Sequence, residues 1–200
     1  MTPSTDADPH DHLREDPALT PLVERHGPLE LAPAADPFAR LVRSVLRQQV
    51  STAAADAVEE RLRETTSLTP TAVLEADPDR LREAGLSAAK TRYVRAVARR
   101  WRDREYSRTA FAGTDDESVR DELTAITGVG PWTADMFLVF ALGREDVFPV
   151  GDLGIRRGTA DLCGLDPEDR TAVRERAAPW RPYRSYAALY VWRHYEGEEA

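Results

Sequence analysis

The sequence predicts an all-α fold, because apolar residues recur at helical spacing and no segment shows the alternation of a half-buried strand. The clearest helical stripe lies within residues 37–49 and consists of Phe38, Leu41, Val42, Val45 and Leu46. Two serines, Ser51 and Ser87, directly precede further helical segments, where a hydroxyl can accept a bond from the first backbone amides. The 200 residues provide enough chain to bury a core in one domain or in two small lobes.

The helices can be assigned in order from these signals. Residues 1–15 are rich in Asp, Pro and His, so we expect a disordered acidic leader in which His10 and His12 are solvated. A short helix is expected over residues 16–26, where Gly27 ends it, and a proline-rich connector follows. The remaining helices are expected over residues 37–49, 51–62, 71–76, 78–84, 87–101, 115–125, 132–142, 153–163 and 167–177, with a last one ending near residue 193.

Two glycines mark the turn between the helices expected over residues 115–125 and 132–142. The turn reads Thr127-Gly128-Val129-Gly130 and lets the backbone enter positive φ twice, and Pro131 suits the first turn of the next helix. That next helix is apolar almost throughout and is therefore expected to be buried. A helix–hairpin–helix of this kind can hold one phosphate, because the hairpin amides and the following helix N-terminus point the same way.

The net charge of −8 would argue against nucleic-acid binding if it were uniform, but the charges are segregated. Residues 87–108 hold eight basic side chains against two acidic ones, and residues 170–193 hold six against one. Such local basic faces govern contacts with phosphate. The single cysteine, Cys163, excludes a disulfide framework and a four-thiolate iron–sulfur cluster.

Residues 123–157 resemble the helix-hairpin-helix motif of the DNA glycosylase superfamily, and in particular its alkylated-base (3-methyladenine) members. In that family a catalytic aspartate follows the hairpin at the start of a helix, and the matching residue is Asp152 in Val150-Gly151-Asp152-Leu153-Gly154-Ile155. Residues 44–51, 85–93 and 180–193 are also similar to the family. The resemblance implies a glycosylase domain over residues 16–200, without an iron–sulfur cluster, in which two helical lobes surround a cleft. A lobe of about 37–130 would be inserted between the terminal helices.

The resemblance also assigns DNA contacts outside the hairpin. At the corner Gln48-Gln49-Val50-Ser51, one side chain would enter the duplex and fill the space left by the extruded base. Gln49 matches this wedge, with Gln48 beside it, although two ordinary polar residues at a helix end are the alternative. The full set of expected DNA contacts is Gln48, Gln49, Ser51, Gly128, Gly130 and Thr133.

Trp132, Met136 and Trp192 are the expected walls of the base pocket. An alkylated purine carries positive charge, which the face of an electron-rich ring attracts. Trp192 matches a tryptophan that lines the pocket in the family. The alternative is that Trp192 belongs to the hydrophobic core, as aromatic residues at helical spacing usually do. Met136 stands where some relatives have tyrosine, which leaves the range of accepted bases open.

Asp152 is the expected catalytic residue. Breaking an N-glycosidic bond develops positive charge on the sugar, and a carboxylate fixed beside C1′ stabilises that charge and can activate water. An N-cap role for the helix at Leu153 is the alternative, and the two roles are compatible. Family members that also cut the strand carry lysine where Trp132 stands, and Lys90 is the only lysine. We therefore expect a monofunctional hydrolase that releases 3-methyladenine or 7-methylguanine in base excision repair.

No cofactor is required by this chemistry, although the family's hairpin commonly holds Na⁺ or K⁺ through carbonyls that match Thr124, Ile126 and Val129. The expected partner is double-stranded DNA with a damaged base, bound by a monomer. No apolar run is long enough to span a membrane and no signal-peptide core is seen, which favours a cytoplasmic, nucleoid-associated protein.

Two alternatives remain open at this point. One is a uracil, mismatch or oxidised-purine glycosylase on the same scaffold, which the tryptophans Trp132 and Trp192 disfavour mildly because uncharged bases call for polar groups. The other is a non-catalytic DNA-binding module, which the aspartate at the catalytic spacing disfavours.

Overall fold

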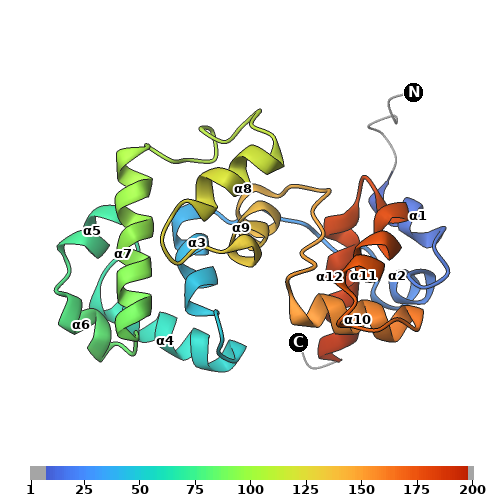
Figure 1. Ribbon diagram of the computed structural model, residues 1–200, viewed down its shortest axis with the longest axis horizontal. Helices are drawn as coiled ribbons and strands as arrows, with labels where there is room; N and C mark the ends of the chain where they lie inside the picture. The colour runs from blue at the N-terminus through green and yellow to red at the C-terminus, as the bar shows by residue number, and fades with distance from the viewer. Residues whose placement is uncertain (1–7, 198–200) are drawn as a thin grey trace. The chain divides into compact units, whose positions relative to one another are not determined.

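The computed structural model describes residues 8–197, and this part of the chain is helical without any strand, which confirms the predicted all-α fold. The chain divides into two compact units (Figure 1). The middle unit is Pro33–Leu142, and the terminal unit combines Met1–Ala32 with Gly143–Ala200. Within the described residues, no helix is both long enough and apolar enough to cross a membrane.

The middle unit is built around α3, which packs against both α7 and α9. The sequence Asp36-Pro37 starts α3, because the Asp36 side chain accepts the Ala39 amide and proline fits the first turn. Its helices are α3 (Pro37–Leu46), α4 (Thr52–Thr65), α5 (Pro70–Glu75), α6 (Pro78–Glu83), α7 (Ala88–Asp103), α8 (Asp116–Thr124) and α9 (Pro131–Phe137). After α9 the chain continues as a π-helical turn, η1 (Leu138–Leu142). The two ends of the unit meet where the Ala34 amide donates to the Phe140 carbonyl at 2.8 Å.

The terminal unit joins both ends of the chain around a shared apolar core. Its helices are α1 (Pro9–Arg14), α2 (Thr20–His26), α10 (Leu153–Cys163), α11 (Arg170–Arg176), the 3₁₀ turn η2 (Ala178–Trp180) and α12 (Arg184–Glu196). Leu13, Leu19 and Val23 from the start of the chain are fully buried in one cluster with Ile155, Trp180 and Tyr190 from its end. This burial explains why short N-terminal helices persist: their stability comes from packing and not from helix propensity.

The N-terminal segment differs from the expected disordered leader. Asp8 caps α1 and Leu13 is fully buried, so the expectation is wrong for residues 8–15, while residues 1–7 lie outside the described part. His10 is buried, with Nδ1 2.8 Å from the Tyr190 hydroxyl, which in turn donates to the Gly27 carbonyl at 2.7 Å. The compact middle unit also runs beyond the expected 37–130, because α9 and η1 belong to its core.

Candidate nucleic-acid interface and active site

The hairpin between α8 and α9 is closed by its own backbone. The Ile126 amide donates to Leu123 and the Val129 amide to Ile126, each at 3.0 Å. Gly128 has φ +90°, in the left-handed region, and a Cβ there would lie only 2.1 Å from the ring of Tyr93. Glycine is therefore required at position 128 by both its backbone conformation and the packing of α7.

Gly130 differs from Gly128, and the expectation of two positive φ values is wrong. Its φ of −99° and ψ of 177° are extended values that any residue adopts, and a Cβ would meet nothing within 4 Å. Gly130 is the N-cap of α9 and has no side-chain cap. The open space beside it leaves the hairpin backbone accessible to a ligand.

Arg120 and Asp135 join the two helices that flank the hairpin. The Arg120 Nε lies 2.7 Å from a carboxylate oxygen of Asp135, whose side chain is only 13% exposed. Burial raises the pKa of Asp135, while the hydrogen bond and charge of Arg120 oppose the rise. A largely buried ion pair thus ties α8 to α9 and fixes the geometry of the hairpin.

The corner between α3 and α4 contacts the hairpin through one of its two glutamines. The Gln48 side-chain amide donates to the Gly128 carbonyl at 2.8 Å and to the Thr133 hydroxyl at 2.9 Å. Thr133 is only 1% exposed and its hydroxyl accepts from Gln48, so the structure buries this expected DNA contact instead of presenting it at the surface. Gln49 instead is exposed and has φ +57°, and Ser51 caps α4 by accepting the Ala54 amide.

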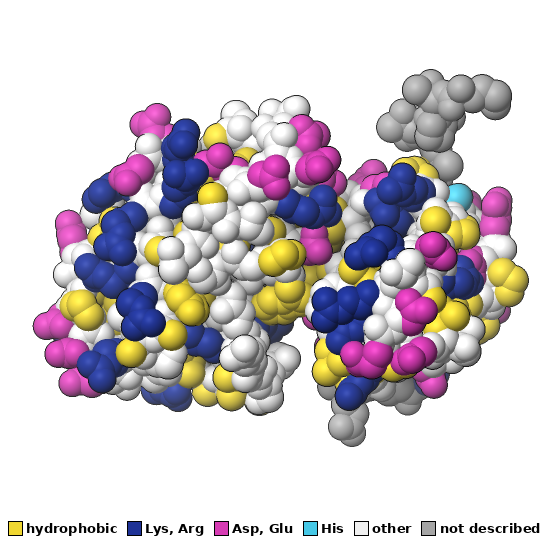
Figure 2. Space-filling model, viewed as in Figure 1, with side chains coloured by type: hydrophobic (Ala, Val, Ile, Leu, Met, Phe, Trp, Pro, Cys, Tyr) yellow, Lys and Arg dark blue, Asp and Glu magenta, His cyan; other side chains and the backbone are white. Residues whose placement is uncertain are grey.

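The basic face of the middle unit follows α7. Its exposed arginines are Arg92, Arg99 and Arg102, and Figure 2 shows basic side chains gathered over the part of the surface where α7 lies. Lys90 is not part of this exposed face: its ammonium donates to the Leu46 carbonyl at the end of α3, at 2.5 Å. Burial lowers the pKa of Lys90.

The expected base-pocket residues are divided between the two units. Trp132 and Met136 lie one turn apart on α9 in the middle unit, where Trp132 is half-buried and Met136 is buried. Trp192 lies on α12 in the terminal unit and is half-buried. Asp152 belongs to the same unit as Trp192.

Asp152 is half-buried and held by two donors. Its Oδ1 accepts the Ile155 amide at 3.0 Å, as the N-cap of α10, and the indole Nε1 of Trp192, also at 3.0 Å. The cap role and the contact with the aromatic ring therefore occur together in one carboxylate. Two fixed donors of this kind hold the carboxylate in one orientation.

Three residues beside Asp152 were missed by the sequence reasoning. A Cβ at Gly154 would lie 3.2 Å from Asp152 Oδ1 and 3.3 Å from Trp192 Cδ1, so the absence of a side chain lets the pair approach. Leu153 and Tyr195 are large apolar residues that stay 44% and 43% exposed next to the carboxylate. The position of Tyr195 one helical turn after Trp192 was the available signal.

The loop before Asp152 is held by a buried arginine that sequence reasoning also missed. Arg156 is 6% exposed, and its guanidinium donates to the carbonyls of Gly151 and Pro167, both at 3.1 Å. These bonds attach the loop to the chain beyond α10. Arg156 therefore supports the position of Asp152 from within the protein.

The described residues contain no group of three or more His, Cys, Asp or Glu side chains that could hold a metal ion. The carbonyls expected to hold a monovalent cation are those of Thr124, Ile126 and Val129. The Ile126 carbonyl already accepts the Val129 amide, and a carbonyl oxygen has a second lone pair. Backbone carbonyl oxygens are donors that can replace the hydration shell of K⁺.

Residues 42–182 match the model of a family described as "HhH-GPD superfamily base excision DNA repair protein". The chain belongs to this superfamily. Within the HhH-GPD superfamily, it is similar to "Probable bifunctional transcriptional activator/DNA repair enzyme AlkA" of Mycobacterium tuberculosis. The two are 35% identical over 94% of this chain, which spans 40% of the length of that relative.

Two solved structures are similar to this chain over nearly its whole length. A DNA-3-methyladenine glycosidase from Bacillus halodurans has a TM-score of 0.81 and 33% identity, covering 96% of this chain and 91% of that one. Schizosaccharomyces pombe Mag1, a 3-methyladenine DNA glycosylase in complex with abasic DNA, has a TM-score of 0.87 and 27% identity, covering 97% and 99%. The predicted relationship to alkylated-base glycosylases and the predicted enzyme class, a DNA glycosylase, are confirmed by these matches.

Proposed function

We propose that this protein is a monofunctional glycosylase that hydrolyses the N-glycosidic bond of alkylated purines, such as 3-methyladenine and 7-methylguanine, in double-stranded DNA. The observation that carries the proposal is the Asp152 carboxylate, which a helix amide and the Trp192 indole hold beside aromatic surface. The relatives named as 3-methyladenine glycosylases support the same substrate class.

The proposed chemistry follows from the properties of a cationic leaving base. The bond from C1′ to the purine nitrogen breaks, its electron pair leaves with the base, and positive charge develops on the deoxyribose. Asp152 stabilises that charge, and water adds to C1′ while passing a proton to the carboxylate. Because alkylation has already made the base a good leaving group, no strong general acid is needed.

The remaining roles are divided between base contacts and backbone contacts. Trp192, which lies in the same unit as Asp152, is proposed to contact the extruded cationic purine, which the face of an indole attracts. The amides of Gly128 and Gly130 are proposed to hold a phosphate that approaches from the side of Gly130, where the space is open, because the Tyr93 ring packs against Gly128. Gln49 is proposed to fill the vacated stack and Ser51 to lie beside it, since Gln48 is engaged with the hairpin.

Strand cleavage is not part of the proposal. Schiff-base formation with the opened sugar needs an amine, and the only lysine, Lys90, donates to the Leu46 carbonyl. We also propose that the protein acts as a monomer on genomic DNA. A Na⁺ or K⁺ ion at the carbonyls of Thr124, Ile126 and Val129 would assist the hairpin in holding a phosphate.

Asp152→Asn tests the catalytic assignment. Asparagine keeps the cap of α10 but has no charge, so we expect single-turnover excision of 3-methyladenine to fall about a thousandfold. Affinity for abasic-site duplex should stay within about threefold of the wild-type value, since no transition-state charge is present there. Oligonucleotides carrying each lesion, scored for abasic sites with and without alkali, measure both rate and lyase activity.

Asp169→Asn is the matched control for this test. Asp169 also caps a helix of the terminal unit, by accepting the Thr171 and Ala172 amides at 3.1 and 3.0 Å. We expect this variant to excise at the wild-type rate. Undiminished excision by Asp152→Asn would overturn the assignment, and breaks that appear without alkali would overturn the monofunctional proposal.

A further inference from the structure

We propose that Gln48 is a positioning residue that couples the hairpin to Gln49, so that holding a phosphate and filling the base stack become one concerted event. The inference rests on the proposed function and adds to it a residue that would contact neither the base nor the sugar. It is carried by the contacts within the middle unit that hold the corner at residues 47–51.

The first contact is the pair of hydrogen bonds from Gln48 itself. Its amide reaches across to Gly128, inside the hairpin, and to Thr133, in the first turn of α9. Gln48 thus bonds to both parts of the proposed phosphate site. The next residue, Gln49, has its backbone in the left-handed region and its side chain exposed.

The second contact comes from one face of α7. Lys90 donates to the Leu46 carbonyl, two residues before Gln48, while Tyr93, one turn further along α7, packs against Gly128. The corner and the hairpin are therefore supported by the same helix. This common support keeps the distance that Gln48 spans constant.

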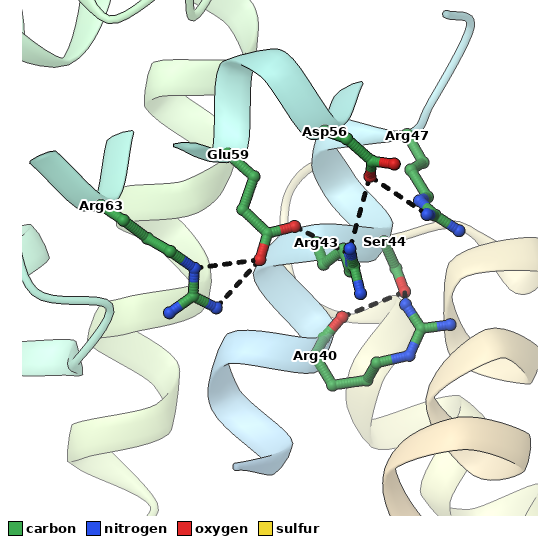
Figure 3. A network of polar contacts seen from close by, with 7 residues as sticks. All are labelled: Arg40, Arg43, Ser44, Arg47, Asp56, Glu59 and Arg63. Carbon is green, nitrogen blue, oxygen red and sulfur yellow. Dashed lines mark hydrogen bonds and ion pairs between the residues drawn. The ribbon is translucent and has the colours of Figure 1, made fainter. Parts of the chain in front are cut away.

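The third contact is an ion-pair network between α3 and α4 (Figure 3). Arg47 and Arg43 both reach Asp56, at 3.1 and 3.4 Å, and Glu59 pairs with Arg43 at 2.8 Å and with Arg63 at 2.9 Å. These pairs hold the helices on either side of the corner. The network does not include the hairpin, whereas Gln48 makes a polar side-chain link from the corner to it.

The two neighbouring glutamines therefore have different roles: Gln48 positions the corner, and Gln49 is the wedge. Gln49 adopts a backbone conformation that a residue with a side chain rarely keeps unless its surroundings impose it. The bonds of Gln48 impose it by fixing the preceding residue on Gly128 and Thr133. Without them, Gln49 would remain in the chain but would lose its fixed place relative to a phosphate held at the hairpin.

A double-mutant cycle tests this coupling. Gln48→Met keeps the length of the side chain and removes its donors, and Gln49→Ala removes the proposed wedge. Excision of 3-methyladenine is measured when the base is opposite thymine and when it lies in a single-base bulge, where little pairing must be broken. In parallel, the protein is bound to an abasic-site duplex that carries 2-aminopurine beside the site. The fluorescence of 2-aminopurine rises when this base is unstacked, so it reports unstacking without requiring catalysis.

We expect Gln48→Met to slow excision from the paired duplex at least tenfold and from the bulge less than threefold. Gln49→Ala should do the same, and the double variant should be no slower than either single one, because both changes remove one function. The rise in 2-aminopurine fluorescence on binding should be reduced equally in the two single variants and the double variant. Glu60→Met, on an exposed position of α4, is the control and should leave every readout unchanged.

Different results overturn different claims. Equal losses in the paired and bulged substrates, or multiplicative losses in the double variant, would show that Gln48 does not act through Gln49. A wild-type protein that excises neither substrate yet gives the expected 2-aminopurine pattern would refute the proposed function and retain the coupling. An unchanged signal in Gln48→Met would refute the coupling whatever the excision result.

Discussion

At the residue scale, Gly128 and Gly130 have different reasons to be glycine within one turn. Gly128 has a positive φ and the Tyr93 ring against it, whereas Gly130 has an extended backbone and open space. Sequence alone treats both as turn residues. The structure separates a glycine that the fold needs from one that only a close ligand would need.

Alanine substitutions distinguish these two cases. Gly128→Ala should lower the free energy of unfolding by about 3 kcal/mol, since the methyl group is strained by φ and meets Tyr93. Gly130→Ala should change it by no more than about 0.5 kcal/mol but weaken binding to abasic-site duplex about tenfold. Urea unfolding and fluorescence anisotropy measure the two quantities. Equal stabilities for both variants would contradict the structural role of Gly128.

At the residue scale, the sequence predicted candidate site residues, and the contacts that it missed share one cause. Asp152 became the catalytic candidate through the resemblance to the glycosylase motif, and its predicted role as the cap of α10 is confirmed. The partner of Gln48 could not be predicted, because Gly128 lies 80 positions away and only the packed unit brings them together. Arg156 was missed for a similar reason, since buried arginine looks identical to surface arginine in a sequence.

At the element scale, the turn between α1 and α2 is attached to α11 and η2 by one carboxylate. Asp16 accepts two bonds from the Arg176 guanidinium, at 2.7 and 2.5 Å, and one from Trp180 Nε1 at 2.8 Å. Burial alone would raise the pKa of Asp16, but the bonds from Arg176 and Trp180 outweigh it and lower the pKa. The first helices of the chain are thus attached to its last ones.

The lowered pKa of Asp16 gives a pH dependence with a definite sign. The folded state binds the proton less tightly than the unfolded chain, so this stabilisation is present above the ordinary pKa and is lost as pH falls through the folded value. At pH 7, Asp16→Asn should lower the free energy of unfolding by about 3 kcal/mol. The difference from wild type should shrink in urea titrations below about pH 4, and a pH-independent difference would contradict the role of the carboxylate.

Most elements were predicted by local signals, and α1 shows where those signals fail. Helix starts followed from proline in the first turn, as at Pro131, and from serine caps, as at Ser51 and Ser87. The leader was judged by its polar composition, yet Leu13 and the buried His10 anchor α1 against residues from the other end of the chain. A helix that is stabilised by packing against distant residues cannot be predicted from a short stretch of its own sequence.

At the whole-molecule scale, the middle unit is a continuous piece of chain whose ends are adjacent. The bond between Ala34 and Phe140 joins its entry to its exit, and its core is made of its own helices. The terminal unit, in contrast, needs two separate segments. The division into units therefore predicts that the middle unit can fold without the rest of the chain.

Residues 33–142 expressed alone should fold. We expect a helical circular dichroism spectrum and one cooperative thermal transition, because the fragment keeps its core and both of its ends. It should bind duplex DNA weakly through the hairpin but release no base, since it lacks Asp152. A fragment that shows no cooperative transition would contradict the independence of this unit.

The placement of Lys90 has a practical consequence for chemical modification. An amine-directed ester or cross-linker has a single side-chain target in this protein, and that amine is engaged with the end of α3. Acylation of Lys90 would require its amine to leave the Leu46 carbonyl. The rate of acylation therefore reports how often the corner beside Gln49 opens. Few proteins offer such a reporter without first removing competing lysines.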